Sequence, residues 1–170
     1  MKGGAEVTID HYIQQHGRRL FGLCMTLCAD RFSAEDLYQE TWLRVCRRIG
    51  QYDTRREFEP WLTGICVNTY RDELRRRKLS RLFDGFASTE EKEQTINAVE
   101  APGPEDHSDL HAAIDRLPDK LRVAVILHYF HDMKHEQTAA ALGIPVGTVK
   151  SRLNQAKKRL REELQYEADI

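Results

Sequence analysis

Few residues of this chain have the types and spacing that catalysis or metal binding requires. Asp36 and Glu40 lie one helical turn apart, but no third carboxylate follows at a spacing suited to a divalent cation. His128, His131 and His135 are spaced i, i+3 and i+7, but a helix break is expected before the third, which would remove it from the shared face. No P-loop, HExxH or GxSxG motif occurs. We therefore expect no catalytic residue, no metal ion and no cofactor.

The cysteines and the apolar runs indicate an intracellular protein. Cys24, Cys28, Cys46 and Cys66 lie inside apolar helical patterns and form no CxxC pair, which favours buried hydrophobic residues over a disulfide scaffold. No apolar run approaches the roughly 20 residues that cross a bilayer, and the polar N-terminus lacks the apolar core of a signal peptide. The sequence therefore predicts a soluble, cytoplasmic protein with no direct membrane insertion.

Charge is nearly balanced in total but distributed unevenly. The chain carries 26 Lys and Arg against 27 Asp and Glu, a net charge of −1. Residues 71–81 hold six basic and two acidic side chains, and residues 147–161 hold six basic and none acidic. Residues 84–109, in contrast, hold eight acids and a single base. Because a polyanion responds to the local field, the neutral total does not exclude a nucleic-acid partner.

The second basic stretch has the chemistry of a DNA-reading helix. In "GTVKSRLNQAKKRL" the spacing of Val149, Leu153, Ala156 and Leu160 predicts one packing face. On the opposite side, Lys and Arg would neutralise phosphates, and Asn, Gln and Ser would reach base edges in a major groove. Thr148 is expected to cap this helix and to leave its first N–H groups pointed at a phosphate. The residues on that opposite side are Lys150, Ser151, Asn154, Gln155, Lys158 and Arg161.

The elements around this helix have the proportions of a helix-turn-helix. An apolar helical segment, "DKLRVAVILHYFHD", is followed by "HEQTAAALG", a turn at "IPVG" and the basic helix. The alternative is a solvated basic surface, but such surfaces usually alternate acids with bases, and no acid occurs here before Glu162. We therefore expect residues 110–170 to form a helix-turn-helix domain.

An earlier helix, "SAEDLYQETWLRVCRRIG", carries the paired carboxylates. Ser33 is expected as its N-cap, with Asp36 completing a capping box, and Gly50 as its stop. Asp36 and Glu40 repel slightly at i, i+4, so only pairing of Glu40 with Arg44 benefits the isolated domain. A basic partner would use this face well, but an ordinary charged surface explains it equally.

The next helix, "PWLTGICVNTYRDELRRRK", combines aromatic residues, an asparagine and a basic end. Pro60 suits its first helical position. Asn68 interrupts the apolar stripe and is either a hydrogen-bonded packing residue or part of a pocket for an unstacked base. In the second case Phe58, Trp61 and Tyr70 are available as walls or stacking faces. Spacing alone does not separate these alternatives.

The chain is therefore predicted to be all-α, with two small helical domains joined by a flexible acidic linker. Helical periodicity is missing only from about residues 79–109, where large apolar residues are few and Pro102 and Pro104 flank Gly103. A structureless loop of that length is uncommon inside one compact domain. We expect domains at residues 1–78 and 110–170, with the helix-turn-helix in the second.

Both halves together resemble one family. They read "AEDLYQETWLRVCRRIGQYD", "FEPWLTGICVNTYRDELRRR" and, after the linker, "AIDRLPDKLRVAVILHYFHDMKHEQTAAALGIPVGTVKSRLNQAKKRLREEL". This combination resembles the extracytoplasmic-function (ECF) class of bacterial RNA polymerase sigma factors, in the sigma-70 family. The resemblance covers about residues 10–78 and 110–164, and either half alone is less specific than the two in this order.

The resemblance implies three groups of site residues. The first domain would bind core polymerase and read the minus-10 element, with Asn68 near a flipped base and loop residues 53–57 shaping its pocket. The second domain would read the minus-35 element. With the side-chain chemistry above, the assigned residues are Asp36, Gln39 and Glu40 for core polymerase, Trp61, Asn68, Arg71, Arg75 and Arg76 for minus-10 DNA, and Thr148, Lys150, Ser151, Arg152, Asn154 and Lys158 for minus-35 DNA.

The implied function is that of an alternative-type sigma factor, which performs no covalent chemistry. Its implied partners are the beta-prime clamp helices and the beta flap of bacterial core polymerase, promoter DNA and an anti-sigma factor. A stand-alone helix-turn-helix regulator is the first alternative; it explains residues 144–164 equally well but gives no role to "DLYQE". A nucleic-acid-processing enzyme that binds metal through Asp36 and Glu40 is the second, and it lacks a third ligand.

Overall fold

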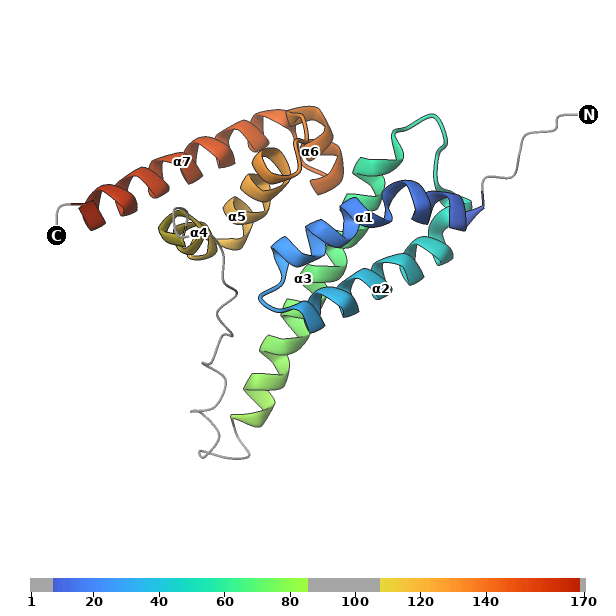
Figure 1. Ribbon diagram of the computed structural model, residues 1–170, viewed down its shortest axis with the longest axis horizontal. Helices are drawn as coiled ribbons and strands as arrows, with labels where there is room; N and C mark the ends of the chain where they lie inside the picture. Colours follow the sequence, from blue (N-terminus) through green and yellow to red (C-terminus); the bar gives the residue numbers. More distant parts are fainter. Residues whose placement is uncertain (1–7, 86–107, 169–170) are drawn as a thin grey trace, which may run out of the picture. The chain divides into compact units, whose positions relative to one another are not determined.

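The computed structural model describes residues 8–85 and 108–168, and within these ranges every regular element is helical (Figure 1). The predicted all-α class is confirmed. The chain divides into two compact units, Met1–Ala98 and Val99–Ile170. Among the described helices, none combines the length and the apolar character needed to cross a membrane.

The described part of the first unit, residues 8–85, contains three long helices. They are α1 (Ile9–Leu27), α2 (Arg31–Arg48) and α3 (Phe58–Asp84), with a 3-10 turn, η1 (Ile49–Gln51), after α2. α2 packs against both other helices, because each helix buries one apolar stripe. The buried side chains include Leu20, Leu23, Leu27, Leu37, Val45, Leu62, Ile65 and Val67.

The starts of α2 and α3 differ from the sequence prediction. Asp30, and not Ser33, is the N-cap of α2: its Oδ1 accepts the backbone N–H of Ser33 at 2.8 Å. The N–H of Ser33, which the predicted capping box assigned to Asp36, therefore binds a carboxylate three residues earlier in the chain. α3 begins at Phe58, so Pro60 is its third residue, where the N–H that proline lacks would have no partner within the helix.

α3 continues beyond the predicted domain boundary at Lys78 and ends at Asp84. Its last turns extend past α1 and α2 (Figure 1). Leu79, Leu82 and Phe83 are 55%, 65% and 76% exposed there. The start of the predicted linker is thus helical, while residues 86–107 of that linker lie outside the described residues.

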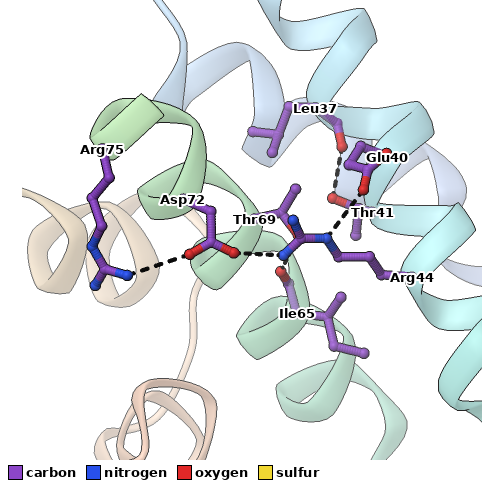
Figure 2. Close-up of polar contacts among 8 residues, drawn as sticks. All are labelled: Leu37, Glu40, Thr41, Arg44, Ile65, Thr69, Asp72 and Arg75. Carbon is purple, nitrogen blue, oxygen red and sulfur yellow. Dashed lines mark hydrogen bonds and ion pairs between the residues drawn. The ribbon is translucent and has the colours of Figure 1, made fainter. Parts of the chain in front are cut away.

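Arg44 of α2 connects α2 to α3 through a short chain of ion pairs (Figure 2). Its Nε donates to Glu40 Oε1 at 3.2 Å, and its Nη1 donates to Asp72 Oδ2 of α3 at 2.8 Å. Arg75 Nη1 reaches the other oxygen of Asp72 at 3.4 Å. The predicted pairing of Glu40 with Arg44 is present, and the longer chain ties the acidic end of one helix to the basic part of the next.

The second unit has its own core. Its elements are α4 (Ser108–Asp115), α5 (Asp119–Val125), a π-helical turn, η2 (Ile126–Phe130), α6 (His135–Leu142) and α7 (Val146–Ala168). The predicted packing face of α7 is confirmed: Val149, Leu153 and Ala156 are buried, and Leu160 packs against the core at its edge. The other core members are Ile114, Leu117, Leu121, Ala124, Val125 and Ala139.

The turn between α6 and α7 depends on one left-handed residue. Gly143 has φ 64° and ψ 38°, and its N–H donates to the carbonyl oxygen of Ala139. The N–H of Ile144 donates to the same oxygen at 3.1 Å, and the side chain of Ile144 packs against the core. This is a glycine C-cap with its hydrophobic contact, and it ends α6 so that α7 can start in a new direction.

Separating Arg44 from Asp72 should destabilise the first unit in a pH-dependent way. For a double-mutant cycle of Arg44→Met and Asp72→Asn, we expect a coupling free energy of about 0.5–1 kcal/mol at pH 7, as for other partly exposed pairs. The hydrogen bond from Arg44 lowers the pKa of Asp72 below its usual 3.8. The coupling is therefore complete above that value and is lost as the pH falls through the lowered pKa.

Urea unfolding followed by tryptophan fluorescence measures this coupling, because both tryptophans of the chain, Trp42 and Trp61, lie in the first unit. Arg75→Met is the matched control. Arg75 contacts the same carboxylate at 3.4 Å, but its side chain is 74% exposed, so its coupling should be close to zero. Equal couplings for the two arginines would contradict the special position of Arg44.

Gly143 and Gly147 form a matched pair for testing the turn. An added Cβ meets no atom within 4 Å at either position, but only Gly143 has a positive φ. We expect Gly143→Ala to lower the free energy of unfolding of the second unit by about 1–2 kcal/mol. Gly147→Ala, inside α7, should be neutral or stabilise by up to about 1 kcal/mol. Thermal unfolding followed by far-UV circular dichroism measures these changes, and tryptophan fluorescence follows the first unit separately. An equal change in the stability of the second unit in both variants would contradict this account.

Candidate polymerase and nucleic-acid interfaces

The predicted polymerase-binding residues share one side of α2 but differ in their contacts. Asp36 and Gln39 are exposed, and within the described ranges neither side chain has a hydrogen-bond or ion-pair partner. Glu40 is half-buried and accepts from Arg44. Asp36 and Gln39 are therefore available to a partner as they stand, whereas Glu40 would have to share its carboxylate.

Leu43 is a surface residue that sequence reasoning missed. It lies four residues after Gln39 on the same side of α2 and is 51% exposed. The buried stripe of α2 contains Leu37, Thr41 and Val45, so the spacing of Leu43 from that stripe was a usable signal. An exposed leucine beside two polar side chains gives this face an apolar contact as well as charge.

The predicted minus-10 residues lie along one side of α3. Trp61, Asn68 and Arg75 are seven residues apart, so they follow one another along two-turn steps. Asn68 is exposed between the buried Val67 and Thr69. This position excludes the reading of Asn68 as a packing residue. Arg71 is half-buried and Arg76 is exposed on the same stretch.

Phe58 is not available as a stacking face for a base. It is only 8% exposed, and its ring stacks on Tyr12 of α1 with centroids 4.0 Å apart. Trp61 is half-buried, and its ring is tilted against that of Tyr52 with centroids 4.8 Å apart. Phe58 and Trp61 are thus engaged with other aromatic rings of the first unit, which favours burial of their faces. Trp61 keeps only part of its surface open.

The loop before α3 is held by polar contacts of its own residues. Asp53 Oδ1 accepts the backbone N–H of Arg55 at 3.1 Å and its Nε at 2.9 Å. These hydrogen bonds from Arg55 lower the pKa of Asp53. The Tyr52 hydroxyl donates to the carbonyl oxygen of Arg56, and burial raises the pKa of that tyrosine. The loop is therefore ordered around an ionised carboxylate and a protonated phenol at neutral pH.

The predicted minus-35 residues lie on α7 but are not equally open. Lys150, Ser151, Asn154 and Lys158 are exposed, whereas Thr148 and Arg152 are half-buried at the margin of the packed face. The predicted capping role of Thr148 is wrong. α7 starts at Val146, and the N–H of Thr148 already donates to the carbonyl oxygen of Pro145 at 3.0 Å.

The basic residues of α7 and α3 differ in how they are neutralised. Lys150 and Lys158 have no ion-pair partner among the described residues. Lys157, by contrast, lies over the ring of Tyr129 at 5.6 Å. On α3, Arg75 contacts Asp72, and Arg77 contacts Glu73 at 3.5 Å. Lys150 and Lys158 of α7 therefore offer uncompensated positive charge, while Arg75 and Arg77 of α3 offer charge that an acidic neighbour already shares.

The cysteines and histidines form no metal site in the part of the chain that the structure describes. Cys24 and Cys66 are buried with their sulfurs 3.8 Å apart. Their mutual hydrogen bond and burial raise the pKa of Cys24, and burial raises the pKa of Cys28 to about 11, so both thiols stay protonated and unreactive. Cys46 is exposed, and the prediction that it is buried is wrong.

The predicted histidine face is divided between two elements. His128 belongs to the π-helical turn η2, whereas His135 opens α6, as the expected helix break implies. Their rings stack with centroids 4.6 Å apart. His128 Nδ1 donates to the carbonyl oxygen of Met133 at 2.8 Å. These contacts describe packed imidazoles that join the end of η2 to the start of α6.

Comparison with known proteins assigns each unit to a region of one protein family. Residues 12–80 match the family description "Sigma-70 region 2", and residues 107–160 match "Sigma-70, region 4". The first match covers α2 and most of α1 and α3, and the second covers α4 to α6 and most of α7. The two regions follow each other in the order that the sequence resemblance implies.

Individual relatives agree with this assignment. The chain is 35% identical over 162 residues to the ECF RNA polymerase sigma factor SigE of Mycolicibacterium smegmatis, covering 91% of this chain but 61% of that protein. It therefore spans less than two thirds of that relative's length. It is 34% identical over 146 residues to the ECF RNA polymerase sigma factor EcfG of Rhodopseudomonas palustris, covering 84% of this chain and 76% of that protein.

The fold is also similar to that of a solved structure. The sigma factor RpoE of Bartonella quintana, crystallised in complex with the anti-sigma factor NepR, superposes with a TM-score of 0.74 and 24% identity. The match covers 92% of this chain and 96% of that chain. Two sigma-70 regions in one chain, with relatives of this identity, lead to one conclusion: the chain belongs to the ECF class of the sigma-70 family of RNA polymerase sigma factors.

Proposed function

We propose that this protein is an alternative-type sigma factor that binds core RNA polymerase and directs promoter-specific initiation by reading minus-10 and minus-35 elements. The observation that carries this function is the presence of both sigma-70 regions, in order, on two separately folded units of one chain. The protein supplies sequence recognition and performs no covalent chemistry of its own. It acts in the cytoplasm, where polymerase and DNA meet.

The exposed face of α2 is the proposed contact with the beta-prime clamp helices. Asp36 and Gln39 support this assignment because they are exposed and have no partner among the described residues. Leu43 adds an apolar element to the same face. Glu40 contributes through its ion pair with Arg44. The beta flap is the second proposed contact on core polymerase.

The proposed DNA contacts divide between the two units by chemistry. On α3, the exposed Asn68 is assigned to an unstacked minus-10 base, with Arg71, Arg75 and Arg76 on backbone phosphates and Trp61 as an adjacent apolar wall. On α7, lysines and short polar side chains suit a duplex major groove at the minus-35 element. Two weak readers on one scaffold gain affinity through effective concentration.

An anti-sigma factor is the further partner that we propose. The similar Bartonella sigma factor was crystallised with one. On this chain, Leu82 and Phe83 at the end of α3 are 65% and 76% exposed, and neighbouring exposed apolar side chains are typical of protein contacts. A partner that covers these residues and the basic part of α3 would keep the protein from DNA.

In vitro transcription tests the function directly. With bacterial core polymerase and fragmented genomic DNA, the protein should produce discrete start sites that core polymerase alone does not produce. The shared sequences upstream of those sites would give both promoter elements. Binding of duplex DNA by the protein alone, without any dependent initiation, would instead support a stand-alone regulator.

Replacing Asp36 and Gln39 with alanine should weaken the complex with core polymerase by about tenfold or more, because the minority of interface side chains that lie at its centre each cost more than about 1 kcal/mol when truncated. Direct binding measurements with core polymerase report this loss. The fold should be unchanged, because neither side chain has a partner within the described residues. Glu35→Ala is the matched control: Glu35 is a neighbouring exposed acid whose ion pair is with Arg31 of the same helix. Equal weakening in the control would contradict the assigned face.

Lys158→Ala and Asn154→Ala should affect minus-35 recognition differently. Losing a phosphate contact at Lys158 should weaken holoenzyme binding to all promoter sequences alike and reduce the slope of log affinity against log salt by about 1. Losing Asn154 should relax the choice of base at one position. Lys120→Ala removes an equally exposed charge from α5 and should leave the salt slope unchanged. A single effect common to all three variants would argue against α7 as the reading helix.

A further inference from the structure

The loop between α2 and α3 is anchored by aromatic side chains at both of its ends. Tyr52, just before the loop, packs edge-on against Phe58, just after it, with ring centroids 5.3 Å apart. Phe58 stacks on Tyr12 of α1, and the Tyr52 ring also contacts the Trp61 ring of α3, with centroids 4.8 Å apart. The loop ends are therefore fixed to two helices of the first unit and not only to each other.

Polar contacts then fix the backbone within the loop. The N–H of Arg56 donates to the carbonyl oxygen of Asp53 at 3.0 Å, and the Asp53 carboxylate accepts the N–H of Arg55. These two bonds form a turn in which an aspartate side chain replaces a backbone acceptor. The Tyr52 hydroxyl crosses the loop and donates to the carbonyl oxygen of Arg56. That bond joins the turn to the aromatic anchor.

The outer part of the loop is open to solvent. The side chains of Arg55 and Arg56 are 88% and 84% exposed, and that of Asp53 is 35% exposed. The two ends of the loop are thus held by packing, while its tip is available to a ligand. A binding element that is already ordered discriminates better between ligands, because misplaced contacts cannot be repaired by loop movement.

We propose that Tyr52 is a positioning residue for base selection at the minus-10 element. Its ring and hydroxyl hold residues 53–57 in the shape against which an unstacked base is accepted or rejected. Tyr52 does not need to touch DNA, because it acts through the carbonyl group of Arg56 and the aromatic rings. This inference rests on the proposed function and on the resemblance, which assigns loop residues 53–57 to the minus-10 pocket.

The test compares Tyr52→Phe with Tyr12→Phe in full-length protein bound to core polymerase. Both changes keep an aromatic ring in the same cluster. Only Tyr52 loses a hydrogen bond, since the Tyr12 hydroxyl has no partner among the described residues. Initiation is counted on a pool of promoter templates that is randomised over the minus-10 element.

We expect Tyr52→Phe to reduce the ratio of initiation on the preferred base to that on the next base by about three- to tenfold, the effect of one hydrogen bond. Total initiation should stay within about twofold of the parent protein. Tyr12→Phe should retain the parental ratio. A purely structural role of Tyr52 would lower total initiation and leave the ratio unchanged.

Amide hydrogen exchange in the free protein provides a second readout. The N–H groups of Arg55 and Arg56 should exchange faster in Tyr52→Phe and at parental rates in Tyr12→Phe. Unchanged base ratios, unchanged exchange, or equal changes in both variants would overturn the inference. A parent protein that fails to initiate at all would instead contradict the proposed function, and the inference with it.

Discussion

The packing of α2 against α3 is the constraint on which both proposed interfaces of the first unit depend. Thr41 and Thr69 are fully buried, and each hydroxyl donates to a carbonyl oxygen one turn earlier on its own helix, so this interior contains no unsatisfied hydroxyl at either position (Figure 2). At the edge of the same contact, Arg44 joins Asp72 across the two helices. The acidic face of α2 and the basic part of α3 are consequently held in one rigid unit.

The two basic helices, α3 and α7, would present different electrostatics to a nucleic acid. Lys150 and Lys158 of α7 carry charge that no described acid neutralises, which suits nonspecific attraction to duplex phosphates. Arg75 of α3 already contacts Asp72, so a phosphate would have to compete with that carboxylate. A competing carboxylate weakens binding to any polyanion and leaves more of the selectivity to groups that contact bases, the role proposed for Asn68.

The second unit shows how a small number of backbone positions can orient α7, the helix proposed to read DNA. Gly143 adopts a left-handed conformation that ends α6, and the following Ile144 packs into the core. Val149, Leu153 and Ala156 then bury one side of α7 against the same core. Because that side is committed to packing, the polar side chains on the opposite side have no alternative but solvent or a partner.

The sequence by itself determined the helical class, the two units, the packing face of α7 and the family, because helical periodicity, turn residues and motif order are local properties of the chain. Only the tertiary structure decided that Asp30 caps α2, that α3 runs to Asp84 and that Thr148 lies inside α7. It also decided that Asn68 is exposed, that Phe58 is covered by Tyr12 and that Asp72 binds Arg44. These features depend on which faces of distant helices meet, and spacing along one helix specifies a residue's neighbours on that helix but not its partner on another.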